Sequence, residues 1–333
     1  MPVARLNPNN WSLPAVSLCL LMGCLLLTGC PWQSYVQKHS GLPPVAFQGK
    51  PSLEELMSAV NTTQMVKQLQ SQGAKISVAG APTLKAQFIV EQPKKFRLTA
   101  GLFDFTATEV DFGSNEQLAW LWVKQQADPA VIFVRHDQLA TTAARHYFPI
   151  DLNWITEAMG LVYLDPAGFH EGPFEHQNGS YEVRTRLQTP SGEVTRRMII
   201  DNRFGWVLEQ HLTQANGQIL ASVKASEHSF YPRYGVSLPH RVQIQLFPGS
   251  EYQMAFQIDV PRYQINNNVG DANQIWTMPK YDGYPQIDLS KMNPPQATQY
   301  APPTIQQRIP ASLPGASQSR IASPRYSSDL LIR

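Results

Sequence analysis

Alternation of apolar and polar residues dominates most of the chain after residue 84. In 85–91, Ala86, Phe88 and Val90 alternate with Gln87, Ile89 and Glu91, and 181–188 shows the apolar-polar pattern over a longer stretch. Successive side chains of a strand point to opposite faces, so this period predicts an antiparallel sheet with one buried and one solvated face. The pattern predicts strands at 75–79, 85–91, 96–100, 119–124, 131–135, 181–188, 194–200, 206–212, 219–223, 241–247 and 251–260.

Turn residues separate several of these predicted strands. Asn216-Gly217 is typical of a two-residue hairpin turn, and Asp201–Gly205 and Pro190–Gly192 are also turn-forming. The stretches 241–247 and 251–260 should pair with each other. We expect Val242, Ile244 and Leu246 opposite Tyr252, Met254, Phe256 and Ile258.

Two segments have helical spacing instead. Ser52 and Glu55 match a capping box, and apolar residues recur behind them as far as Leu69. This predicts an amphipathic helix over 52–72, kinked near residues 61–63 and ending before Gly73. A shorter helix is predicted at 152–159, stopped by Gly160. The stretch 165–179 is interpreted as a loop.

A sheet of roughly ten strands twists and curls instead of staying flat. The predicted fold class is therefore mainly β (α+β), a curled antiparallel sheet with a small helical lid, which leaves a concave apolar cavity. Ordinary core is the commoner role of any single aromatic residue, so the ligand hypothesis concerns the cavity as a whole. Its candidate lining residues are Phe88, Phe96, Leu98, Trp120, Trp122, Phe133 and Trp154.

The N-terminus has the pattern of an export signal. An apolar run from Ala15 to Leu27 is followed by Leu27-Thr28-Gly29-Cys30, and a spanning helix would need about 20 apolar residues. This arrangement resembles the lipobox of bacterial lipoproteins. It implies a signal peptide at 1–29, a lipid on Cys30 and a tether at 30–51. A plain signal peptide or a short membrane anchor is the alternative.

A lipid on Cys30 would place the protein at the cell envelope, anchored to a membrane, with its domain facing the periplasm. The sequence does not determine whether that membrane is the inner or the outer one. The other cysteines, Cys19 and Cys24, lie in the predicted signal peptide, so the mature chain would have no partner for a disulfide.

Composition changes this picture little. The 333 residues are 43% hydrophobic and 16% charged, with a formal net charge of +2. No strongly basic cluster is present, so nucleic acid is not an expected partner. Beyond residue 280, Pro, Gln, Ser and Ala dominate without periodicity, which predicts a disordered tail at 281–333. Oligomeric state is not determined by these patterns.

Catalytic motifs are largely missing from the sequence. His170, Glu171 and His176 do not fit the helical zinc signature, because Gly172 and Pro173 interrupt the segment. There is no Gly-x-Ser-x-Gly elbow and no phosphate-binding glycine loop. We therefore expect no enzyme activity, no metal and no cofactor. A hydrolase using the His170 segment is the weakest alternative.

One further pattern resembles a known superfamily. Gln92-Pro93-Lys94-Lys95-Phe96-Arg97-Leu98 leads into an alternating strand, and Phe112-Gly113-Ser114-Asn115-Glu116 precedes Trp120-Leu121-Trp122. With a helix before the first strand and a meander after, this resembles the superfamily of the periplasmic lipoprotein carrier and the outer-membrane lipoprotein receptor. The resemblance covers about 52–260, within a predicted domain at 52–280.

The resemblance implies a half-barrel closed by helices that holds acyl chains in its hollow. By position it implies a membrane-contact loop at Leu102 and Phe103, for which ordinary strand-end core is the alternative. The expected function is binding of an acyl lipid or lipoprotein at the cell envelope. The alternative is a non-catalytic envelope scaffold with a solid core.

Replacing the predicted lipidation site gives a direct test. In Cys30→Ser, incorporation of a palmitate analogue in a bacterial host should be lost, because the remaining thiols, Cys19 and Cys24, lie within the apolar run and not at its end. The readouts are metabolic labelling and the mass of the N-terminal peptide. Cys24→Ser is the matched control and should retain the label. Persistent labelling of Cys30→Ser would show that another residue is the anchor.

Overall fold

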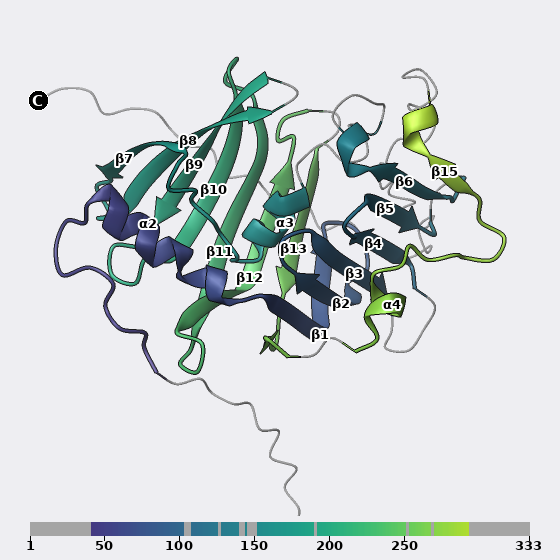
Figure 1. Ribbon diagram of the computed structural model, residues 1–333, viewed down its shortest axis with the longest axis horizontal. Helices are drawn as coiled ribbons and strands as arrows, with labels where there is room; N and C mark the ends of the chain where they lie inside the picture. Colours follow the sequence, from purple (N-terminus) through teal and green to yellow (C-terminus); the bar gives the residue numbers. More distant parts are fainter. Residues whose placement is uncertain are drawn as a thin grey trace, which may run out of the picture. The chain divides into compact units, whose positions relative to one another are not determined.

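The computed structural model describes residues 41–102, 108–125, 128–139, 144, 152–189, 192–250, 253–267 and 270–292. The predicted signal peptide, Cys30, Phe103 and residues 293–333 lie outside this part of the chain. The described part forms one curled, open sheet with short helices (Figure 1), which confirms the predicted fold class. The helices are α2 (Leu53–Asn61), α3 (Leu152–Ala158) and α4 (Ala272–Ile275), with 3₁₀ turns η1 (Thr62–Met65), η2 (His136–Gln138) and η4 (Leu289–Lys291).

The sheet consists of two meanders. The first is β1 (Gln68–Val78), β2 (Leu84–Glu91), β3 (Lys95–Gly101), β4 (Val110–Ser114), β5 (Leu118–Val123) and β6 (Val131–Arg135). The second is β7 (Phe169–Glu175), β8 (Tyr181–Thr189), β9 (Gly192–Ile200), β10 (Val207–Gln214), β11 (Ile219–Tyr231), β12 (Val236–Leu246) and β13 (Met254–Asp259). The short strands β14 (Gln264–Ile265) and β15 (Gln286–Asp288) pair with β1 and β6, respectively.

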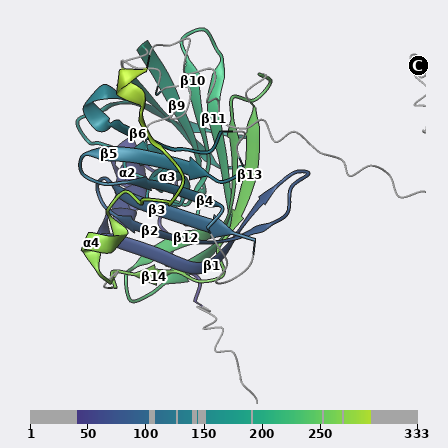
Figure 2. The same ribbon diagram turned by 90° about the vertical axis from the view of Figure 1, so that its right-hand side faces the viewer.

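Pairing of β1 with β13 joins the two meanders. The strand order is β15-β6-β5-β4-β3-β2-β1-β13-β12-β11-β10-β9-β8-β7, with β14 added beside β1. All pairs are antiparallel except β15 with β6, which is parallel. Strands of the first meander run across those of the second (Figure 2), as expected when twist accumulates over so many strands.

The predicted helix over 52–72 is only half correct. Its capping box forms, with Ser52 N donating to Glu55 Oε2 at 2.8 Å and Glu55 N donating to Ser52 Oγ at 3.2 Å. The helix ends at Asn61, however, and β1 begins at Gln68. Leu69 pairs with Val90 on one side and Ile265 on the other, so strand pairing overrides the helical spacing.

Two other stretches are more regular than predicted. The loop expected at 165–179 contains the edge strand β7, which pairs with β8. The chain expected to be disordered from residue 281 continues in β15 and η4 to residue 292, and Leu289 is fully buried. It packs in a cluster with Ala119, Ile132 and Val134. Neither segment shows a clear alternation of apolar and polar residues. Each is ordered by pairing with a neighbouring strand, β7 with β8 and β15 with β6.

Several local predictions are confirmed. Val242, Ile244 and Leu246 pair with Ile258, Phe256 and Met254, as the alternation indicated. Gly217 adopts a φ of 85° in the predicted hairpin turn, where its N–H donates to Gln214 O. Helix α3 is followed by Gly160, which has a φ of 98°.

The space between the two meanders is filled by α3 and the residues after it. Trp154, Met159 and Leu161 are buried in one cluster with Phe88 and Phe96 of the first meander. The same cluster contains side chains of the second meander: Leu212, Ala221, Val223, Val242, Ile244 and Ile258. Here the predicted hollow is a packed core.

Helix α2 covers the other end of the second meander (Figure 1). Leu56 and Met57 pack against Tyr181, Val183 and Met198, which point from β8 and β9. A buried ion pair fixes the neighbouring segment, with Arg196 Nη1 at 2.5 Å from Glu157 Oε2 on α3. The two helices therefore cover adjacent stretches of the same sheet.

Gly113→Ala should destabilise the fold. A Cβ at Gly113 would lie 2.1 Å from the ring of Trp120, which is fully buried and has no room to move. We expect a loss of about 1–3 kcal/mol in the free energy of unfolding, measured by chemical denaturation. Gly49→Ala is the control, because nothing lies within 4 Å of its Cβ. Equal stability of the two variants would contradict this packing.

Candidate functional site

The seven candidate cavity residues lie on two different faces of the sheet. Leu98 pairs with Phe112, and Phe112 pairs with Leu121, so these three side chains share one face. Because side chains alternate along β5, Trp120 and Trp122 point to the other face. Phe88, Phe96, Leu98 and Trp154 therefore belong to the core between the meanders, whereas Trp120, Trp122 and Phe133 form a separate cluster.

The second cluster is covered by the chain that follows α4. Trp122 stacks on Tyr281 with ring centroids 3.9 Å apart, and Tyr284 packs edge-on against it at 5.5 Å. Trp120 Nε1 donates to Asp111 Oδ1 at 3.1 Å. None of the seven side chains lines the cavity described below.

Asp111 holds this covering segment in place. Its carboxylate is fully buried and accepts from Arg97 Nη2 at 2.8 Å and from Tyr281 Oη at 2.7 Å. Arg97 Nη1 donates onward to Ile275 O at 2.9 Å. Burial and then the bond to Asp111 raise the pKa of Tyr281, so its hydroxyl remains a donor. The cluster is structural: the Asp111 carboxylate has its partners within it, whereas Trp122 Nε1 is buried without a hydrogen bond.

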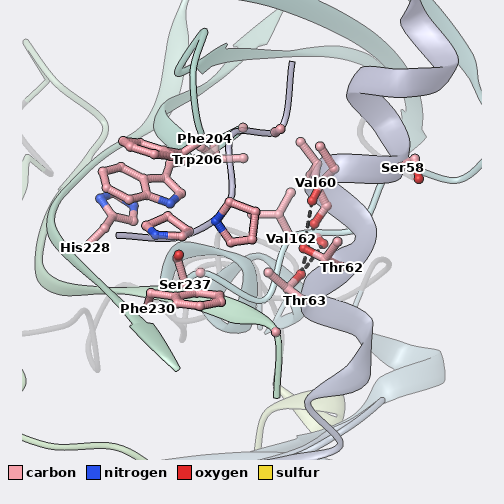
Figure 3. A pocket seen from close by; sticks show the side chains of 18 of the residues that line it. Ser58, Val60, Thr62, Thr63, Val162, Phe204, Trp206, His228, Phe230 and Ser237 are labelled. Atoms are coloured by element: carbon pink, nitrogen blue, oxygen red, sulfur yellow. Dashed lines mark hydrogen bonds between the residues drawn. The ribbon is translucent and has the colours of Figure 1, made fainter. Parts of the chain in front are cut away.

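A cavity of about 470 Å³ lies instead beneath α2 (Figure 3). Its walls come from α2 and η1, the segment 43–46, the turn 204–207, and the paired ends of β11 and β12. Ala59, Val60 and Val162 form an apolar side. The facing side contains Trp206, His228, Phe230 and Ser237.

The turn before β10 shapes this cavity. Asp201 Oδ1 accepts from the backbone N–H groups of Arg203 at 2.9 Å and Phe204 at 2.6 Å. Gly205 has a φ of 71°, and a Cβ there would lie 3.0 Å from Ala59 Cβ. A glycine at this position thus allows α2 to approach the turn closely, while Phe204 and Trp206 on either side face the cavity.

Three rings stack along one wall. Phe204 and Trp206 have centroids 4.7 Å apart, and Trp206 and His228 are also 4.7 Å apart with an interplanar angle of 9°. Burial lowers the pKa of His228 to about 4, an effect that Asp201 opposes and His240 reinforces. The imidazole is therefore neutral at pH 7.

Some polar groups of the cavity have no partner in the described residues. Trp206 Nε1 is buried without a hydrogen bond. No hydrogen bond involves the side chain of His228 or Ser237 within the same part of the chain, whereas Thr62 and Thr63 donate to backbone carbonyls. Glu55 is the one charged residue among the described lining residues.

Sequence reasoning did not find this site. Trp206, His228 and Ser237 come from three elements, and only the pairing of β11 with β12 brings the last two together. The nearest signal was the aromatic turn Phe204-Gly205-Trp206, in which two large rings flank a glycine.

The other candidate positions have structural surroundings. His170 Nδ1 lies 2.8 Å from Thr185 Oγ1, and His176 Nε2 lies 2.9 Å from Glu182 Oε2. Glu171 pairs with Arg186 at 2.7 Å. Among the described residues no group of three His, Cys, Asp or Glu side chains is arranged to hold a metal ion.

The described helices are all too short or too polar to cross a membrane. Leu102 of the predicted membrane-contact loop is 38% exposed just beyond the end of β3.

Comparison with known proteins gives distant structural similarity only. No family model matches the sequence, and no curated protein matches it. A candidate outer membrane lipoprotein-sorting protein domain from Vibrio parahaemolyticus aligns with 10% identity and a TM-score of 0.43, covering 66% of this chain and 94% of that one. A LolA superfamily protein from Nitrosomonas europaea aligns with 8% identity and a TM-score of 0.42, covering 69% and 99%.

A DUF1329 family protein from Desulfovibrio piger aligns with 10% identity and a TM-score of 0.44, covering 66% of this chain and 93% of that one. The Nitrosomonas protein belongs, by its description, to the superfamily that the sequence resembles. The curled sheet itself is established by this chain's own strand pairings.

The buried neutral imidazole predicts a pH dependence of stability. Because the unfolded chain binds the proton more tightly, stability should fall as pH decreases from about 6.5 to about 4. The loss assigned to this group is at most about 3 kcal/mol. His228→Phe keeps a ring against Trp206 without a titrating group, so its denaturation midpoints should fall less over this range. Parallel curves for the two proteins would contradict the assignment.

Proposed function

We propose that this chain is a membrane-anchored, non-catalytic protein of the cell envelope that binds an acyl chain of a lipid or lipoprotein beneath α2. The observation that carries the proposal is the cavity of about 470 Å³, whose described lining contains a single charged residue. Small-molecule sites usually measure about 300–1,000 Å³ and are mostly apolar with a few polar groups.

Burial of hydrocarbon supplies the binding energy in this proposal. Each buried methylene contributes about 0.8 kcal/mol, and the side formed by Ala59, Val60 and Val162 offers apolar contact. Phe230 of β11 adds an apolar ring on the facing side. A chain of several methylenes would therefore bind without any specific polar contact.

The proposed anchor lies close to this site in sequence. The second half of the predicted tether contributes Pro43, Pro44 and Ala46 to the cavity wall, and Ala46 N donates to Arg203 O at 2.7 Å. A lipid on Cys30 would thus attach to the same segment that walls the cavity. Leu102 and Phe103 remain the proposed membrane contact, with the domain facing the periplasm. The choice between inner and outer membrane stays open.

A second candidate is a scaffold without a ligand. The interior between the meanders is filled by α3, which supports a solid core there. The edge strand β7 also exposes Phe169 by 57% and Phe174 by 42%, each beneath an arginine guanidinium. Such a surface suits a protein partner. The cavity beneath α2 favours the ligand-binding function over this one.

Filling the cavity should abolish binding. Ala59→Trp adds an indole on the cavity side of α2, whereas Glu54→Trp, the control, adds one at an exposed position outside the lining. We expect native mass spectrometry of the full chain, released from detergent micelles, to show a bound acyl lipid in the control only. Absence of lipid in wild-type protein, with no binding of an added acyl probe, would favour the scaffold.

A further inference from the structure

The segment 41–46 presents two exposed apolar side chains at the mouth of the cavity beneath α2. Leu42 is 74% exposed and Val45 is 50% exposed, and Val45 also lines the cavity. A residue that both lines a cavity and is half exposed lies at its opening. Single exposed apolar residues are common on protein surfaces, so the meaning of these two depends on what surrounds them.

Two prolines restrict how these side chains are presented. Pro43 and Pro44 hold φ at about −65° and favour the polyproline II conformation, in which residues three apart lie on the same side. Leu42 and Val45 are three apart, with both prolines between them. The sequence therefore favours a stiff segment with its two large apolar side chains on one side.

The end of this segment is fixed to the domain. Ala46 N donates to Arg203 O at 2.7 Å, and Phe47, which is 8% exposed, packs edge-on against Tyr181. The segment would have to break this hydrogen bond and expose Phe47 in order to move away. Val45, the residue before Ala46, therefore keeps its place beside the turn 203–206.

Arg203 adds a positive charge to the same place. Its guanidinium lies 4.9 Å from the ring centroid of Phe204, which lines the cavity beside Trp206 (Figure 3), and Arg203 is exposed. Within the described part of the chain this guanidinium forms no ion pair, and the nearby carboxylate of Asp201 accepts from two backbone N–H groups instead. An arginine can bind phosphate oxygens through two parallel hydrogen bonds.

We propose that this rim, defined as Leu42, Val45 and Arg203, is a surface by which the anchored protein rests on a phospholipid bilayer, with the mouth of the cavity turned toward the membrane. Leu42 and Val45 enter the head-group region, and Arg203 binds phosphate oxygens. The inference rests on the proposed function, because the lipid on Cys30 supplies the attachment. The rim is a second contact, separate from the one proposed at Leu102.

The proposed anchor favours a bilayer over a protein partner as the occupant. An extended chain spans at most about 3.3–3.6 Å per residue, so the stretch from Cys30 to Leu42 limits their separation to about 40 Å. A tethered surface meets the membrane at a high effective concentration, so a few side chains are sufficient to hold it there. The long stem of Arg203 can lie along apolar surface while its charge stays at the level of the head groups.

This orientation gives an acyl chain a direct way into the cavity. A chain that leaves the bilayer would pass Val45 and reach Val60 and Val162 without crossing water. Exposure of hydrocarbon to water is unfavourable, so entry from the membrane avoids the least favourable step of transfer. The rim thus links membrane attachment to loading of the cavity.

Photolabelling by the bilayer tests this surface. The full chain, produced with its lipid in a bacterial host, would be reconstituted in vesicles of phosphatidylcholine and phosphatidylglycerol that contain a phosphatidylcholine with a diazirine near its head group. Adducts would be localised by tandem mass spectrometry to 41–47, 203–206 and 216–219, the last containing Ile219, which is 38% exposed. We expect the first two segments to carry about tenfold more label than the third.

The apolar part of the rim is tested by a double substitution read on the segment that it does not alter. Leu42→Ser with Val45→Ser should lower the label on 203–206 about fivefold, because less apolar surface enters the bilayer. Both side chains are exposed, so the denaturation midpoint should not change. Ile219→Ser is the matched control and should leave the label on 203–206 unchanged.

The charged part is tested in the same way on the other segment. Arg203→Gln should lower the label on 41–47 about fivefold, which is the usual contribution of one basic residue at a membrane surface. The backbone hydrogen bonds of Arg203 to Asp201 and Ala46 do not depend on its side chain. Arg186→Gln is the control, because its guanidinium lies in the same way over Phe169, at 4.8 Å, but outside the rim.

The outcomes separate this inference from membrane anchoring. If label appears beside Leu102 and not on the rim, the inference is overturned and anchoring stands. The same holds if the chain floats with the vesicles but none of these segments is labelled, or if the rim substitutions act no differently from their controls. If the chain does not float with the vesicles, the membrane anchoring of the proposed function is wrong, and this inference fails with it.

Discussion

Hydrogen bonding between β1 and β13 makes one sheet out of two meanders. The register runs from Lys75 opposite Asp259 to Val78 opposite Phe256, and β1 pairs with β2 along its other edge. Without this pairing each meander would have an additional exposed edge, and α3 would have only one of them to pack against. The buried cluster around Trp154 contains side chains from both meanders, so burial of its apolar surface depends on the pairing of β1 with β13.

The curl of the sheet joined by β1 and β13 determines where space for a ligand remains. Helix α3 fills the hollow between the meanders, and the chain after α4 covers the opposite face of β4 and β5. The covering segment is fixed by Asp111, whose buried charge is compensated by Arg97 and by hydrogen bonds from two rings. A buried carboxylate is tolerated only with such partners. The space left for a ligand therefore lies beneath α2.

Electrostatics and packing act together at that remaining cavity. Burial keeps His228 neutral and stacked on Trp206, and Gly205 lets α2 close over the turn. The wall consequently combines apolar contact with a few unpaired hydrogen-bonding groups and one exposed carboxylate.

Period-two alternation determined most strands and even one register, because Val242, Ile244 and Leu246 must share a face wherever that face is buried. The capping box at Ser52 and the turn at Gly217 were equally local, since each depends on residues within a few positions. Tertiary pairing alone decided that Leu69 belongs to a strand, that β7 and β15 exist, and that Trp122 is covered by Tyr281. The cavity was also decided by the tertiary structure, because Trp206, His228 and Ser237 come together only when the sheet has folded. Local sequence patterns contain no information on contacts between residues that are distant in sequence.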